Sequence, residues 1–194
     1  MTLFRERGYA EVTVAEIADR AGLTKRTFFN HFADKREVLF AGATAFEAGI
    51  LRHLTEADDD LDPMDAAVVA LTRGGLELSQ YGDRARARRD LIASSPELQE
   101  RDLIKMNSLA SAIAGALRQR HVPARTATIT AQAAVAVFTT AYDDWVDDST
   151  ADLHTLMQRS LADLRQAVGP REAPITSGVA AAQVTGASAA APPA

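Results

Sequence analysis

Apolar residues recur at intervals of three and four along most of the chain, and no segment alternates convincingly between apolar and polar residues. The spacing is that of amphipathic helices, and the helix-favouring residues Ala, Leu, Arg and Glu are abundant. We therefore predict an all-α fold of about nine helices, short ones first and longer ones of bundle type after them. The expected helices span residues 3–7, 13–21, 25–31, 34–54, 63–80, 84–94, 96–120, 123–146 and 152–168.

Capping side chains predict several of these helix starts. Thr13 and Glu16 form a T-x-x-E capping box, in which each side chain satisfies a free amide of the first turn. Asp34 and Glu37 repeat the pattern and predict the start of the long fourth helix. Thr24 is a natural N-cap for the third helix.

The second and third helices are expected to pack as a helix-turn-helix. Gly22 would permit the tight turn between them, and the small Ala18 would let the helices cross closely. The apolar positions predicted at the contact are Val14, Ile17, Ala18, Phe28 and Phe32, with Leu23 plugging the turn.

The outward face of the third helix would carry side chains that donate hydrogen bonds, and none that is acidic. These side chains are Lys25, Arg26, Thr27, Asn30 and His31. On periodicity alone, an ordinary helical hairpin with a solvated charged face explains the segment equally well. The capped start, the alanine at the crossing, the glycine in the turn and the acid-free second helix together favour insertion into a DNA major groove.

A specific pattern runs through the same segment. Its positions are Phe4, Gly8-Tyr9, Thr13-Val14, Ile17-Ala18, Ala21-Gly22-Leu23-Thr24, Thr27-Phe28-Phe29, His31-Phe32, Lys35 and Leu39. This pattern resembles the N-terminal signature of TetR-family transcriptional regulators. The resemblance implies a homodimeric, ligand-responsive repressor that binds a palindromic operator and is released by a small apolar effector.

The resemblance also implies roles for individual residues. Thr13 and Thr24 would cap helices and offer hydroxyls to phosphates, and His31 and Lys35 would hold the DNA backbone. Four further residues would meet base edges or nearby phosphates: Lys25, Arg26, Thr27 and Asn30. Of these, Arg26 and Asn30 would be suited to bidentate contacts with guanine and adenine.

The chain departs from the family pattern at two places. Phe29 replaces the usual tyrosine, so a hydroxyl that reaches a phosphate is missing and weaker binding is expected. The first helix also looks cut short, because the family carries further turns before Leu3-Phe4. Either the true start lies upstream, or the DNA-binding head is less well packed than usual.

The division of the chain is expected to follow the family. Residues 1–45 would form the DNA-binding domain and residues 46–168 the ligand-binding and dimerisation domain. The tail, residues 169–194, is rich in Ala, Gly, Ser, Thr and Pro and is expected to be disordered. The resemblance implies that the last two long helices, 123–146 and 152–168, pair with their two-fold mates.

Residues of the larger domain suggest a ligand pocket, although ordinary core packing is the better explanation for any single one of them. Methionine and aromatic side chains suit an apolar effector. The candidates are Met106, Leu109, Ile113, Phe138, Tyr142 and Trp145. Residues 88–98, together with Trp145, resemble a C-terminal domain type of actinobacterial TetR regulators, some of which sense long-chain acyl-CoA. Arg88 and its neighbouring arginines would then meet the ligand phosphates, unless they form a solvated helix face.

The charge distribution of the chain argues against other classes of function. The net charge is −5, but residues 1–40 hold seven Lys or Arg and six Asp or Glu, against 14 and 20 in the remainder. A mildly basic head on an acidic body fits DNA contact at one end and argues against a non-specific architectural DNA binder. A purely helical interaction module would not need a donor-only helix.

An enzyme is not expected. The chain has no cysteine, its four histidines are scattered, and no phosphate loop, nucleophile elbow or metal-binding spacing is present. No cofactor or metal is therefore predicted. No apolar run approaches the length of a membrane span and no signal peptide is readable, so a cytoplasmic location is expected.

Overall fold

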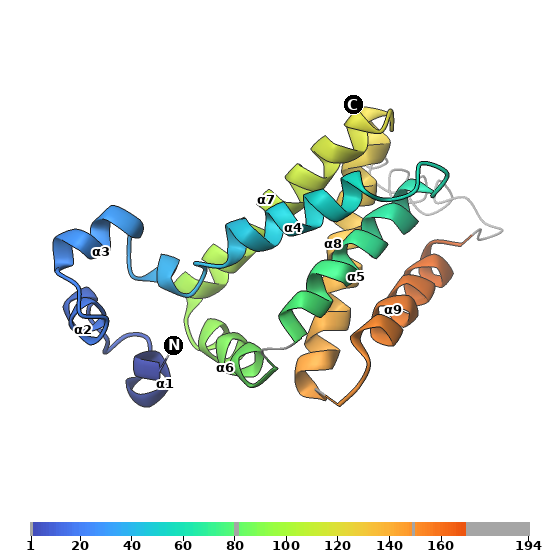
Figure 1. Cartoon of the computed structure of the whole chain (residues 1–194). Coiled ribbons are helices and arrows are strands. Elements are labelled where there is room, and N and C mark those ends of the chain that lie inside the picture. Colours follow the sequence, from blue (N-terminus) through green and yellow to red (C-terminus); the bar gives the residue numbers. More distant parts are fainter. Residues whose placement is uncertain (1, 80–81, 149, 170–194) are drawn as a thin grey trace, which may run out of the picture.

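The computed structural model describes residues 2–79, 82–148 and 150–169 of the chain. Over these residues the fold is all-helical, as predicted, with nine α-helices, one short 3-10 helix and no strand. Figure 1 shows the helices in order. They are α1 (Thr2–Arg7), α2 (Val14–Arg20), α3 (Lys25–His31), η1 (Arg36–Val38), α4 (Ala43–Thr55), α5 (Pro63–Ser79), α6 (Gly82–Ala93), α7 (Pro96–Gln119), α8 (Ala124–Asp147) and α9 (Leu153–Val168). The predicted tail lies, from residue 170 on, outside the described residues.

The larger part of the molecule is a helical bundle built around α8. This helix packs against α5, α7 and α9, while α4 lies along α5 and α7. Small side chains permit the close approach, because Ala127, Ala131, Ala134 and Ala141 of α8 are all fully buried. In Figure 1, α1–α3 lie at one end of this bundle, with α1 beside α6.

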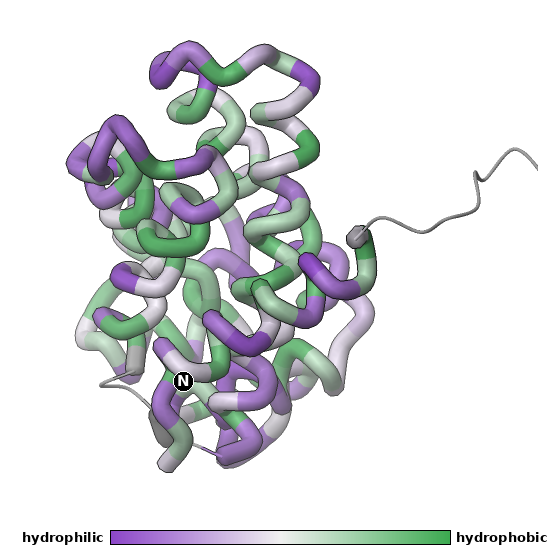
Figure 2. Tube along the Cα trace, turned by 90° about the vertical axis from the view of Figure 1, so that its right-hand side faces the viewer, coloured by the Kyte–Doolittle hydropathy of each residue, from purple (hydrophilic) through white to green (hydrophobic). Residues whose placement is uncertain are grey.

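Apolar and polar residues are interspersed along the helices, as their amphipathic pattern predicts. Figure 2 shows hydrophobic and hydrophilic stretches interleaved along the trace. No helix in residues 2–79, 82–148 or 150–169 combines the length and the apolar character needed to cross a membrane.

Most predicted helix starts are confirmed. Thr13 and Glu16 form the reciprocal capping box of α2, and Thr24 caps α3 by accepting from the N–H of Thr27. Pro63 begins α5 and Pro96 begins α7. Side-chain caps and N-terminal prolines therefore locate these boundaries from the sequence alone.

The predicted long helix over residues 34–54 is wrong, because the chain forms η1, then a turn, and only then α4. Asp34 does accept from the N–H groups of Arg36 and Glu37, at 2.8 and 3.3 Å. The Glu37 side chain, however, binds α7 instead of closing a capping box. Leu39 and Phe40 are both buried, and these tertiary contacts outweigh continued helical hydrogen bonding.

A second apolar core joins the N-terminal part of the chain, α1–α3 (called the head below), to the bundle. Its buried residues come from α1 and the segments beside it (Phe4, Tyr9, Val12), from the turn before α4 (Leu39, Phe40) and from the α6–α7 corner (Leu91, Ile92, Leu98). The head is therefore packed onto the corner between α6 and α7 and is not connected by the chain alone.

Candidate nucleic-acid interface

The helix-turn-helix is built from α2 and α3. Gly22 adopts φ +68, which glycine tolerates without strain, and the N–H of Leu23 donates to the carbonyl of Ala18 at 2.8 Å. Ala18 and Phe28 are each 2% exposed, so they form the buried side of the pair. Leu23 does not plug the turn as predicted, because its side chain is 42% exposed while its backbone closes the turn.

The start of α2 is fixed by a polar cluster. The N–H of Thr13 donates to Glu16 Oε2 at 2.8 Å, and the N–H of Glu16 donates to the Thr13 hydroxyl at 3.3 Å. Arg7 Nη1 donates to Glu16 Oε1 at 2.5 Å. The hydrogen bond from the Thr13 N–H and, to a lesser extent, the one from Arg7 lower the pKa of Glu16 to about 2. This carboxylate is therefore ionised and keeps α1 and α2 in a fixed relation.

The start of α3 is fixed by two threonines. Thr24 Oγ1 accepts from the N–H of Thr27 at 3.1 Å and lies 2.9 Å from the Thr27 hydroxyl. On the inner side, the rings of Phe28 and Phe32 lie 5.2 Å apart. This packing leaves the opposite side of α3 facing outward.

The outward face of α3 carries unpaired donors. Lys25, Arg26, Asn30 and His31 are exposed, and their side chains make no hydrogen bond or ion pair within the described part of the chain. Phe29 is 54% exposed and packs edge-on against Phe28. The face thus offers hydrogen-bond donors beside one apolar ring, which suits base edges and sugars in a major groove.

Lys35 differs from the other predicted contacts, because its ammonium has partners inside the protein. It donates to the carbonyls of Tyr9 and Val12 at 2.7 and 2.9 Å, and lies 4.1 Å from the centre of the Tyr9 ring. Burial, followed by the charge of Glu97, raises the pKa of Tyr9 to about 12. Lys35 therefore holds the loop between α1 and α2 in this structure.

The predicted ligand-pocket residues belong to the bundle core, three of them on α7 and three on α8. Leu109, Ile113, Phe138 and Trp145 are buried, and Met106 and Tyr142 are partly buried against them. The rings of Phe138 and Tyr142 stack 5.6 Å apart. Two open cavities, of about 730 and 650 Å³, lie elsewhere, between α5 and α9 and beside the α7–α8 turn, and none of the six residues lines them.

The arginines of α6 are engaged in contacts within the chain. Arg88 donates to Asp102 at 2.8 Å and lies 5.0 Å over the Phe40 ring. Arg86 and Arg89 both bind Asp147, through its carbonyl at 2.7 Å and its carboxylate at 2.6 Å. A phosphate would have to displace these partners to reach the arginines.

One cluster carries no sequence signal. Glu37 contacts Arg101 and Lys105 of α7, more than sixty positions away in the chain. No sequence pattern connects residues so far apart in the chain, so only the fold reveals these two contacts.

Comparisons with known proteins agree with this geometry. Residues 1–41 match the family described as bacterial regulatory proteins, tetR family, and residues 61–169 match the family described as MftR C-terminal domain. MftR of Mycobacterium tuberculosis, whose name describes a transcriptional regulator of mycofactocin biosynthesis, is 26% identical over 154 residues, covering 78% of each chain.

Two further proteins are similar. The HTH-type transcriptional regulator TcmR of Streptomyces glaucescens is 35% identical over 66 residues, which are 34% of this chain and 29% of TcmR. Among solved structures, the TetR family transcriptional regulator PfmR of Thermus thermophilus aligns with a TM-score of 0.46 and 21% identity, covering 88% of this chain and 96% of PfmR.

Proposed function

The chain belongs to the TetR family of transcriptional regulators, and from this premise we propose that it is a cytoplasmic, ligand-responsive repressor that binds a palindromic operator as a homodimer. The observation that carries the proposal is the outward face of α3, where four donor side chains are exposed and unpaired within the described residues. Exposed donors without partners inside the protein can bind DNA without first breaking an existing hydrogen bond.

The residues of α3 divide by the contact they would make. The guanidinium of Arg26 would bind guanine, and the amide of Asn30 would bind adenine. Lys25 and His31, with the hydroxyls of Thr13, Thr24 and Thr27, would meet phosphates and fix the register of the head. Phe29 would contact sugar or a thymine methyl group.

Dimerisation through α8 and α9 would place two recognition helices on one face of the duplex. Ile129 near the start of α8 is 60% exposed, and Val168 at the end of α9 is 72% exposed. Because α8 and α9 are packed neighbours and only residues 148–152 separate them in the sequence, these two apolar side chains lie toward the same end of the pair. In the dimer, α3 of each protomer would enter successive major grooves about 34–36 Å apart.

An apolar effector would bind more tightly to a conformer in which the two DNA-binding domains of the dimer are too far apart or too close for the operator. It would thereby release the repressor from DNA. The six candidate residues belong to the packed bundle core, so the effector would enter only by separating helices of that core: Met106, Leu109, Ile113, Phe138, Tyr142 and Trp145. An acyl-CoA would in addition need Arg88 to exchange Asp102 for a phosphate. The rise in melting temperature caused by an acyl-CoA, compared with that caused by the free fatty acid, shows whether the CoA phosphates contribute to binding.

DNA binding is tested with the full chain, wild type beside Arg26→Ala, on its own upstream intergenic DNA over a range of salt concentrations. We expect Arg26→Ala to weaken specific binding by about 1–3 kcal/mol. Arg118→Ala is the matched control, because Arg118 is exposed on α7 and also without an internal partner among the described residues. Equal binding by wild type and Arg26→Ala would remove Arg26 from the interface, and no specific binding by wild type would overturn the proposed function.

A further inference from the structure

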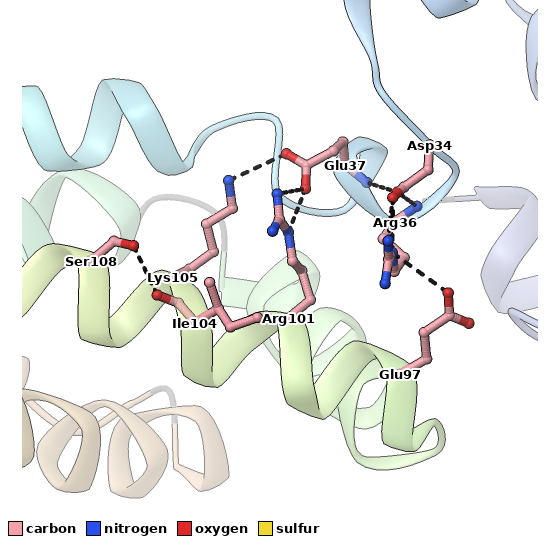
Figure 3. A network of polar contacts seen from close by, with 8 residues as sticks. All are labelled: Asp34, Arg36, Glu37, Glu97, Arg101, Ile104, Lys105 and Ser108. Carbon is pink, nitrogen blue, oxygen red and sulfur yellow. Dashed lines mark hydrogen bonds and ion pairs between the residues drawn. The ribbon is translucent and has the colours of Figure 1, made fainter.

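A pair of ionic contacts joins η1 to α7. Arg101 Nε donates to Glu37 Oε1 at 2.5 Å, and Lys105 Nζ donates to Glu37 Oε2 at 3.2 Å, so each carboxylate oxygen has its own cation (Figure 3). The side chains of Glu37, Lys105 and Arg101 are only 18%, 23% and 29% exposed. Partly buried, charge-assisted contacts of this kind are stronger than exposed ion pairs.

The same segment is held at a third place on α7. Arg36 binds Asp34 Oδ2 at 2.5 Å and reaches Glu97 Oε1 at 3.5 Å. Glu97 and Arg101 are four residues apart on α7, as are Arg101 and Lys105, so all three lie on one face of that helix. Figure 3 shows this face turned toward η1.

Neighbouring side chains of the segment hold opposite parts of the molecule. Lys35 binds the carbonyls of the loop between α1 and α2, whereas Glu37 binds α7. Only residues 32–36 separate the end of α3 from Glu37. A rotation of α1–α3 relative to α7 would therefore strain the contacts of Glu37, along with the second apolar core.

We propose that Glu37, held by Arg101 and Lys105, is a positioning residue that sets the angle of the recognition helix to the body and so selects the spacing of the operator half-sites. The inference rests on the proposed function, because half-site spacing has meaning only for a dimer on DNA. A movement of α7 would be transmitted to α3 through the contacts of Glu37 with Arg101 and Lys105. Glu37 would act through these contacts and not through DNA, because its carboxylate is held by α7.

The DNA test uses a duplex that the wild-type chain selects from a random-sequence library, and versions of it with the central spacer lengthened or shortened by one base pair. Wild type is expected to prefer the selected spacing. Glu37→Gln is expected to reduce that preference about tenfold, because a charge-assisted contact is lost. Arg101→Gln should have a similar effect, and the double variant should add little to either single one.

The matched control is Asp65→Asn. It removes another ion pair between helices, Arg165 Nη2 to Asp65 Oδ1 at 2.7 Å, which lies between α5 and α9. This variant should keep the wild-type spacing preference. If Glu37→Gln instead weakens binding to all spacers by one common factor, Glu37 is merely structural and the inference is overturned.

A second measurement needs no DNA. The chain has no cysteine, so spin labels at Asn30→Cys on α3 and Ser111→Cys on α7 report a unique distance when labelled protein is diluted into unlabelled protein. Glu37→Gln should broaden the distance distribution, and Asp65→Asn should not. An unchanged distribution in Glu37→Gln overturns the inference. Failure of wild type to select any duplex, with broadening present, overturns the proposed function and the selection of spacing, and leaves only the positioning role of Glu37.

Discussion

At the scale of single residues, Glu16 shows how a few neighbours change the chemistry of an exposed carboxylate. The Thr13 N–H, the Arg7 guanidinium and the Thr13 hydroxyl all stabilise its ionised form. Together they lower its pKa from 4.5 to about 2. The sequence predicted the partnership with Thr13, because the capping box is a local pattern, but not the contact with Arg7 across the turn.

Glu16→Gln tests this cluster through its pH dependence. The lowered pKa of Glu16 stabilises the folded state in full above pH 4.5, and this contribution is lost as the pH falls toward 2. We therefore expect the urea midpoint of Glu16→Gln to lie below that of wild type at neutral pH, with the gap closing on acidification. A gap that stays constant with pH would show that the charge of Glu16 does not contribute.

At the scale of elements, α3 depends on its cap and on one buried ring. It is only seven residues long, and an isolated helix of that length is marginal in water. The Thr24 hydroxyl and the packing of Phe28 supply what intrinsic propensity does not. The geometry of α3 is thus set by side chains that face away from the proposed DNA surface or lie at the start of the helix.

Thr24→Ala is expected to lower the free energy of unfolding by about 1 kcal/mol, because the N–H of Thr27 loses its acceptor. Urea unfolding followed by circular dichroism measures the change. Thr24→Ser, which keeps the hydroxyl, should remain close to wild type. Identical stability of Thr24→Ala and Thr24→Ser would mean that water replaces the cap at no cost.

The segment from Asp34 to Phe40 shows why some elements escape sequence analysis. Asp34 caps its own turn, as the sequence indicated, and the apolar spacing beyond it is compatible with one helix. What divides η1 from α4 is the burial of Leu39 and Phe40 in the second core and the attraction of Glu37 to α7. Both causes are contacts between distant segments, which local pattern does not encode.

At the scale of the whole molecule, the part predicted to bind DNA shares the second apolar core with the α6–α7 corner of the body. The sequence predicts a DNA-binding part ending near residue 45, and the exposed donors of α3 lie within it. Phe4, Tyr9 and Phe40 nevertheless pack with Leu91 and with Leu98 of the α6–α7 corner. The candidate DNA-binding residues were predictable because the motif is local, whereas this joint core was not, because its members are apolar residues with no distinguishing spacing.

The shared core predicts that a cavity in the body will loosen the head. Leu98 is fully buried, so Leu98→Ala should destabilise the fold by about 2–5 kcal/mol. It should also reduce hydrogen-exchange protection of α1 and α2, because Leu98 belongs to the same apolar core as Phe4 and Val12. Leu109→Ala is the matched control, since Leu109 is 2% exposed on the same helix but belongs to the bundle core. If the two variants change protection in α1 and α2 equally, the head does not depend on the α6–α7 corner, and its orientation must be set by the polar contacts of Glu37 and Arg36 alone.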